Sequence, residues 1–173
     1  MVVAVFSLSS CEDFGDPPPR IIPGVSIDGI QLAFTREQVE RRAGVPARIG
    51  WADGPYKGWR VYGYDQVRFR WPCFAVYFLE VSGMEYGPVD LVTAGPGYDG
   101  RTREGLGIGS SRGVVHRNLG IPVNIVLYDS LNGGWDDYYC FLKTNMIFRY
   151  NLDTVQFITL GPLVPEPNTP RCD

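Results

Sequence analysis

The chain of 173 residues contains an internal repeat at a constant offset of 76 residues. Residues 29–46, GIQLAFTREQVERRAGVP, align with residues 105–122, GLGIGSSRGVVHRNLGIP. The same offset continues through the pairs Ile49/Ile125, Asp53/Asp129, Gly58/Gly134, Trp59/Trp135 and Tyr62/Tyr138. A repeated segment of this kind is one supersecondary unit that cannot bury its apolar face alone. The sequence therefore predicts a tandem duplication, with a first unit over residues 26–96 and a second over residues 97–163.

Each unit is predicted to begin with a short helix that precedes several strands. Thr35 with Gln38 forms a capping-box pattern, and Gly44 followed by Pro46 predicts where the first helix ends. Ser111 begins the corresponding helix of the second copy. A helix of about nine residues is marginal by itself, so it must pack against a sheet. The predicted fold class is α+β: two tandem repeats, each a short helical segment packed on an antiparallel β-sheet.

The N-terminus carries the pattern of a bacterial lipoprotein. An apolar run ends in Leu8-Ser9-Ser10-Cys11, which resembles a lipobox, in which the cysteine is acylated. Residues 1–11 are thus predicted to be a signal remnant, and residues 12–25 an acidic, proline-rich tether. The basic residues that usually open a secretory signal are missing before Val2. The alternative is a buried N-terminal strand that contains a cysteine by chance, and residues 164–173 are predicted to be a C-terminal tail.

The segment that begins at Tyr98, YDGRTREGLGIGSSRGVVHRNLGIP, resembles a recurring segment of the SmpA/OmlA (BamE-like) lipoprotein family. Its pairing in tandem resembles the two-unit construction of β-lactamase inhibitory protein. The resemblance implies a non-enzymatic protein-binding module with helices on one side of an antiparallel sheet. The BamE-like proteins have one unit, whereas this chain has two. β-Lactamase inhibitory protein has a disulfide in each unit, whereas Cys73 and Cys140 are not equivalent under the offset.

Several classes of function are disfavoured by composition and by the absence of motifs. The net charge of −3, without a basic cluster, argues against nucleic acid as a partner. His116 is the one histidine, is predicted to be a solvated helix residue, and leaves no zinc constellation. No catalytic residue, metal, cofactor or small-molecule substrate is predicted. A hydrolase that uses Asp136 or Asp137 is the alternative, although adjacent strand residues point to opposite faces.

The cysteines and the aromatic residues carry the remaining expectations. In an exported chain two of Cys73, Cys140 and Cys172 are expected to form a disulfide, with the pairing left open. Tyrosine and tryptophan are favoured anchors of protein interfaces. The predicted protein-binding residues are Trp51, Tyr56, Tyr64, Tyr128 and Tyr139, of which Trp51, Tyr56 and Tyr139 are expected to be exposed, whereas Trp59 and Trp135 are expected to be structural.

Together these features predict a non-enzymatic, lipid-anchored protein of the bacterial cell envelope that faces the periplasm or the exterior. Its partners are the membrane, through Cys11, and another protein, through the face of the sheet. The alternative is a secreted inhibitor of an extracellular enzyme, which would need no anchor.

Overall fold

The structure is a computed structural model that describes residues 20–51, 60–64, 73–79, 86–129, 134–141 and 144–161. Within these ranges the side chains of Tyr64, Leu127, Tyr128, Asp129 and Thr144 are not described. The predicted signal remnant 1–11 with Cys11, the first part of the predicted tether and the tail 164–173 lie outside the described residues.

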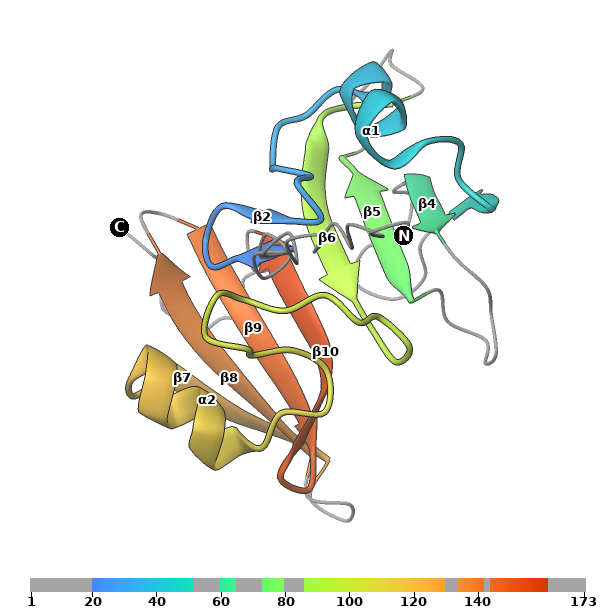
Figure 1. The fold of residues 1–173 in the computed structure, drawn as a ribbon. Coiled ribbons are helices and arrows are strands. Elements are labelled where there is room, and N and C mark those ends of the chain that lie inside the picture. Colours follow the sequence, from blue (N-terminus) through green and yellow to red (C-terminus); the bar gives the residue numbers. More distant parts are fainter. Residues whose placement is uncertain are drawn as a thin grey trace, which may run out of the picture.

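The described residues form two short helices and ten strands. In chain order these are β1 (Ile21–Ile22), β2 (Ser26–Ile27), α1 (Arg36–Ala43), β3 (Arg48–Trp51), β4 (Arg60–Tyr64), β5 (Phe74–Phe78), β6 (Val89–Ala94), α2 (Arg112–Leu119), β7 (Asn124–Asp129), β8 (Gly134–Phe141), β9 (Thr144–Asn151) and β10 (Thr154–Gly161). Strands β1 and β2 pair as a small hairpin, and the other eight form one antiparallel sheet in the order β3-β4-β5-β6-β10-β9-β8-β7 (Figure 1). The α+β class with an antiparallel sheet is therefore confirmed.

Both helices begin and end where the local sequence predicts. The Thr35 hydroxyl accepts a bond from the Gln38 backbone N–H, and the Gln38 side chain accepts one from the Thr35 N–H at 2.7 Å, which completes the capping box. Ser111 caps α2 through the Val114 N–H. At the far ends, Gly44 and Gly120 have φ values of 80° and 84°, a region that favours glycine.

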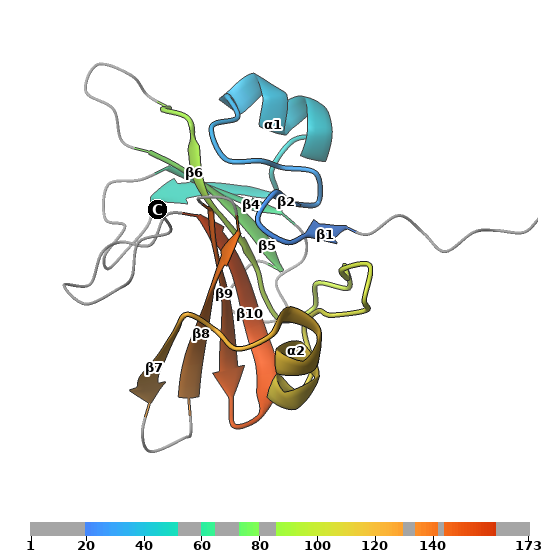
Figure 2. The same ribbon diagram turned by 90° about the vertical axis from the view of Figure 1, so that its left-hand side faces the viewer.

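The helices lie on the same side of the sheet, as Figure 2 shows. Each is too short to be stable alone and is held by packing, with Val39 of α1 and Val115 of α2 fully buried. The core beneath them is built mainly from strand residues, among them Phe74, Val76, Phe78, Met146, Phe148, Ile158 and Leu160.

The N-terminal hairpin lies on the same side of the sheet as the helices (Figure 2). Ile21, Ile27 and Ile30 are fully buried in the core, so residues 20–25 belong to the folded body. The predicted end of the tether at residue 25 was therefore wrong. Burial of the apolar Ile21 side chain stabilises the folded state, and this burial holds the segment against the core. The Arg20 side chain, bonded to Asp28, fixes the start of this hairpin.

The two halves of the sheet have corresponding strand pairings. The β5–β6 pair shifts register so that Asp90 has no partner, and the β9–β10 pair shifts at Gln156 in the same way. The Ala33 N–H donates to the Val89 carbonyl at 2.7 Å, and the Gly109 N–H donates to the Val155 carbonyl at 2.9 Å.

The halves meet where β6 pairs with β10. Thr93 lies opposite Thr159, and their hydroxyl oxygens are 3.4 Å apart. On either side of this pair, Val92 lies opposite Leu160 and Ala94 opposite Ile158. The Thr93–Thr159 pair is therefore the centre of the β6–β10 pairing, with one aliphatic pair on each side of it.

Candidate functional site

Alternation along the strands divides the side chains between two faces of the sheet. Tyr62 on β4 and Asp137 on β8 bond residues of α1 and α2, so their face is the helix side. The opposite face carries no described helix, and we call it the helix-free face. It is formed by Val61, Tyr77, Leu91, Thr93, Asp136, Tyr138, Ile147, Arg149, Phe157 and Thr159.

Asp137 is the centre of a polar cluster between α2 and the sheet. Its side chain is fully buried, and Arg112 donates to both of its oxygens, from Nε at 2.9 Å and from Nη2 at 2.7 Å. His116 Nε2 lies 2.6 Å from Asp137 Oδ2. The prediction of a solvated His116 was therefore wrong: His116 lies four residues after Arg112, so both face the sheet on one side of the helix.

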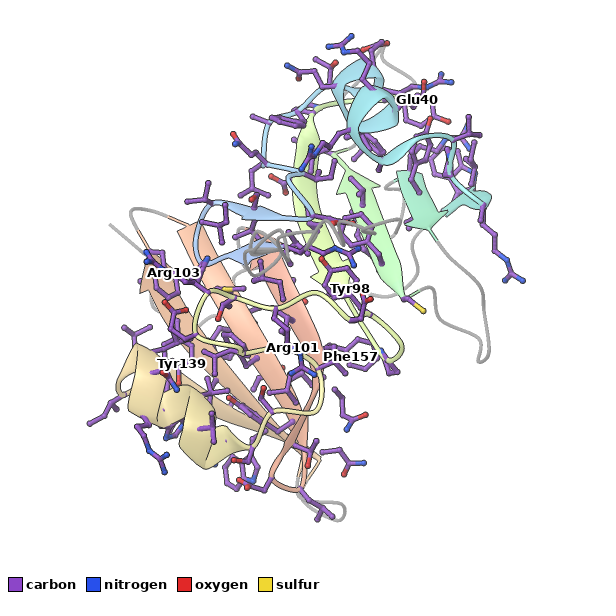
Figure 3. The ribbon with its side chains drawn as sticks, in the orientation of Figure 1. Glu40, Tyr98, Arg101, Arg103, Tyr139 and Phe157 are labelled. Carbon is purple, nitrogen blue, oxygen red and sulfur yellow. The ribbon has the colours of Figure 1, made fainter. Side chains whose placement is uncertain are left out.

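A second polar cluster lies between α1 and the sheet (Figure 3 labels Glu40). Arg36 Nε donates to Glu40 at 2.8 Å, and the Tyr62 hydroxyl donates to the same oxygen at 3.0 Å. These bonds, the one from Arg36 first, hold the pKa of Glu40 below its usual value, whereas burial raises the pKa of Tyr62. The carboxylate of this cluster, Glu40, belongs to the helix, whereas Asp137 of the first cluster belongs to a strand. In both clusters the carboxylate links a helix to the sheet.

The carboxylates considered for hydrolysis are both engaged. Asp136 and Asp137 point to opposite faces, as predicted, because they are adjacent in β8. Arg149 donates to both oxygens of Asp136, at 2.8 Å and 2.7 Å, just as Arg112 does for Asp137. These contacts favour a structural or orienting role for both acids.

The helix-free face carries aromatic and aliphatic side chains around the guanidinium of Arg149, which is bonded to Asp136. Phe157, Arg149 and Asp136 lie side by side across β10, β9 and β8. Phe157 is half-buried, and the Arg149 side chain is 46% exposed. In the other half of the sheet, Tyr77, also half-buried, lies beside Leu91 across β5 and β6, and Leu91 itself is buried. Aromatic residues and arginine are the types enriched at protein interfaces.

Tyr139, one of the predicted binding residues, belongs to the core. It is 3% exposed, its hydroxyl donates to the Gly120 carbonyl at 3.4 Å, and its ring meets Phe148 edge to face (Figure 3). The expectation that Tyr139 is exposed was therefore wrong. It lies two residues after Asp137 in β8 and so points to the helix side.

Trp51, another predicted binding residue, does not lie on the helix-free face. Trp51 is 60% exposed, but it pairs with Arg60, whose guanidinium lies 4.0 Å from the Trp51 ring centroid, on the helix side at the sheet edge. Tyr64 lies in β4, and Tyr128 lies in β7 at the opposite edge. Tyr56 and Trp59 lie outside the described residues. Trp135, expected to be structural, packs against the core.

Sequence reasoning missed Tyr77, Phe157 and Arg149 as surface candidates. The signal that could have found them is the alternation within β5 and within β9–β10, read separately from the repeat. The absence of an aromatic partner in the other copy does not show which face of a strand a residue occupies, as the burial of Tyr139 demonstrates.

The cysteines, possible metal ligands and possible membrane-spanning helices can be assessed within the described residues. Cys140 is disulfide-bonded, while Cys11 and Cys172 lie outside the described residues. In the described part of the chain, His, Cys, Asp and Glu side chains do not gather in any group of three that could hold a metal ion. Neither described helix is long and apolar enough to cross a membrane.

Comparison with known proteins gives little further guidance. No family model matches the chain, and no curated protein matches it. Among solved structures, a DUF4309 family protein (YjgB) from Bacillus subtilis is similar over 82% of this chain and 84% of that chain, with 15% sequence identity and a TM-score of 0.46. We draw no conclusion about function from a similarity of that size.

Proposed function

We propose that this chain is a non-enzymatic protein that binds another protein through the helix-free face. The observation that carries the proposal is the set of partly exposed side chains on that face, with Phe157 and Tyr77 as aromatic anchors and Arg149 between β10 and β8. Asp136 already holds the Arg149 guanidinium in one orientation. A side chain that is ordered before binding loses less conformational entropy when a partner is bound.

We also infer that the chain arose by duplication of one unit, a helix followed by four strands. The support is the element order, which repeats from α1–β6 to α2–β10, and the matched register shifts at Asp90 and Gln156. The Thr93–Thr159 pairing further relates the halves as an approximate two-fold. Duplication would make the binding surface twice as wide as one four-stranded unit allows.

The remaining part of the proposal is a lipid anchor at Cys11, which would place the protein in a bacterial cell envelope. Its support is the order of apolar run, small residues, cysteine and polar tether in the sequence. The alternative, a secreted inhibitor of an extracellular enzyme, uses the same face but needs no lipid. Labelling with a radioactive fatty acid separates the two: an anchored protein should carry the label and lose it in Cys11→Ala, whereas a secreted inhibitor should carry none.

A photo-crosslinking residue placed on the sheet tests the binding face in cells. We expect position 157 or 77 on the helix-free face to crosslink to a protein partner, identified by mass spectrometry. Position 51 is the matched control, since Trp51 is also an exposed aromatic but lies on the helix side. The same protein product from position 51, with none from positions 77 and 157, would contradict the proposal.

A further inference from the structure

The chain enters the folded body on the helix side. The backbone N–H groups of Arg20 and Ile21 both donate to the Arg101 carbonyl at 3.0 Å, and Ile21 is fully buried. The point of entry is therefore fixed beside the segment that precedes α2 (Figure 2). Cys11 lies nine residues before Arg20, and a fully extended chain of that length spans about 30 Å at most. A lipid on Cys11 would thus hold the point of chain entry within about 30 Å of a bilayer.

Exposed aliphatic side chains occur on elements of the same side. Ile22 and Val25 in the N-terminal hairpin are 44% and 43% exposed. Val45 and Ile121 directly follow α1 and α2, at corresponding positions, and are 89% and 88% exposed. A single exposed aliphatic residue needs no explanation. Here, however, nearly full exposure recurs just after each helix, and two aliphatic residues that are less than half exposed adjoin the point of chain entry.

Cationic side chains accompany these aliphatic residues. The exposed arginines on the two helices, the hairpin and the segment before α2 are Arg20, Arg41, Arg42, Arg101, Arg103 and Arg117. Arg20 among them is paired with Asp28 and Asp99. The exposed acids on the same elements are Glu37, Asp99 and Glu104. Figure 3 labels Arg101 and Arg103 on the segment before α2. Arg41 and Arg117 lie in the last turns of the two helices, four residues before Val45 and Ile121. Arginine beside an exposed aliphatic side chain is the combination that binds the headgroup region of an anionic bilayer.

We propose that the helix side rests on an anionic lipid bilayer and thereby turns the helix-free face away from the membrane. The inference rests on the proposed anchor at Cys11 and assigns the anchored protein an orientation. The acyl chain would supply the membrane attachment, while Arg41 and Arg117 contact lipid phosphates and Val45 and Ile121 enter the interface. One acyl chain binds a bilayer only marginally, so a second contact of this kind makes the attachment stable.

Vesicle binding by the full-length Cys11→Ala chain tests the surface without the lipid. We expect the chain to sediment with vesicles of phosphatidylcholine and phosphatidylglycerol, but not with phosphatidylcholine alone. Replacing Arg41 and Arg117 by serine should weaken binding about fivefold for each arginine, and Val45→Ser with Ile121→Ser should also weaken it. The matched control is Arg48→Ser, because Arg48 is exposed but alternates with Ile49 onto the opposite face. Binding that is absent, or equally sensitive to Arg48→Ser, would overturn the inference.

Crosslinking of the acylated protein in membranes then tests orientation separately from function. A photo-crosslinking residue at position 25 or 121 should yield lipid adducts, and one at position 157 should yield none. Lipid adducts from position 157 alone would overturn the orientation. If position 157 yields a protein adduct while positions 25 and 121 yield no lipid, the orientation is wrong but the proposed binding function stands. If the wild-type chain incorporates no labelled fatty acid at Cys11, the anchor itself is wrong.

Discussion

At the scale of single residues, positions that the sequence offset aligns carry different chemistry in the two halves of the sheet. Arg36 and Arg112 begin the two helices, but the acid that each contacts is Glu40 on the helix in one half and Asp137 on the strand in the other. Glu40 is one-third exposed, whereas Asp137 is fully buried. A buried charge that loses its partners costs far more than an exposed one, so the two clusters should differ in their contribution to stability.

Asp137→Asn should therefore lower the free energy of unfolding by about 3 kcal/mol, because it leaves the Arg112 guanidinium without a counter-charge under α2. The control is Asp136→Asn, whose partner Arg149 is nearly half exposed and can be hydrated by water, so the loss there should be about 1 kcal/mol or less. Urea unfolding followed by circular dichroism measures both. Because both carboxylates are buried, equal losses for the two variants would show that the exposure of the partner arginine does not set the cost.

The residue scale is also where prediction from the sequence failed most. The constant offset matches Tyr62 with Tyr138, whereas the strand pairings match Tyr62 with Asp137, one residue earlier. The chain between β7 and β8 is one residue shorter than that between β3 and β4, when Trp51↔Arg60 is compared with Leu127↔Trp135. A shift of one residue moves every side chain of a strand to the other face. That is why Tyr139 is buried and Tyr138 is on the helix-free face.

At the scale of elements, the helices could be predicted and the strand faces could not. Caps at Thr35, Gly44, Ser111 and Gly120 are local chemistry, so the sequence alone places both helices. Strand pairing depends on distant segments and on loop length, neither of which is fixed locally. The N-terminal hairpin was missed for the same reason: Ile21 follows a proline-rich stretch, and only the tertiary contact with the core shows that it is buried.

The turn before each helix provides a test at this scale. Ala33 has a φ of 64°, in the left-handed region, and the equivalent residue in the second half is Gly109 with a φ of 86°. Ala33→Gly should raise the free energy of unfolding by about 0.5–1 kcal/mol, because relief of the steric cost exceeds the greater entropy of the unfolded chain. Gly109→Ala should lower it by about 1 kcal/mol, since a Cβ there meets no neighbouring atom and the cost is purely conformational.

Thermal or urea unfolding of both variants measures these effects. Because the backbone bonds from Ala33 to Val89 and from Gly109 to Val155 correspond, the two changes should be opposite in sign. A loss of stability in Ala33→Gly would show that packing of the alanine methyl group outweighs the steric cost of its positive φ.

At the scale of the whole molecule, the sheet joins eight strands in one surface with both helices and the N-terminal hairpin on one side. The sequence predicted two units, each with an antiparallel sheet, and two of its predicted anchors, Trp51 and Tyr139, lie on the helix side and in the core. The helix-free face instead contains Tyr77 and Phe157, one from each half of the sheet. A partner bound there would span the β6–β10 junction, and the helix side would be left for the membrane.

The central claim, that the helix-free face binds a protein, is tested most directly by measuring partner affinity and melting temperature together for Phe157→Ala. A partner identified by crosslinking would be titrated against wild type, Phe157→Ala and the control Trp51→Ala. Loss of an interface anchor costs about 2 kcal/mol or more, so Phe157→Ala should weaken binding roughly thirtyfold while its melting temperature stays close to that of the wild type. Trp51→Ala should bind normally. Unchanged affinity in Phe157→Ala, or a loss confined to Trp51→Ala, would contradict the account.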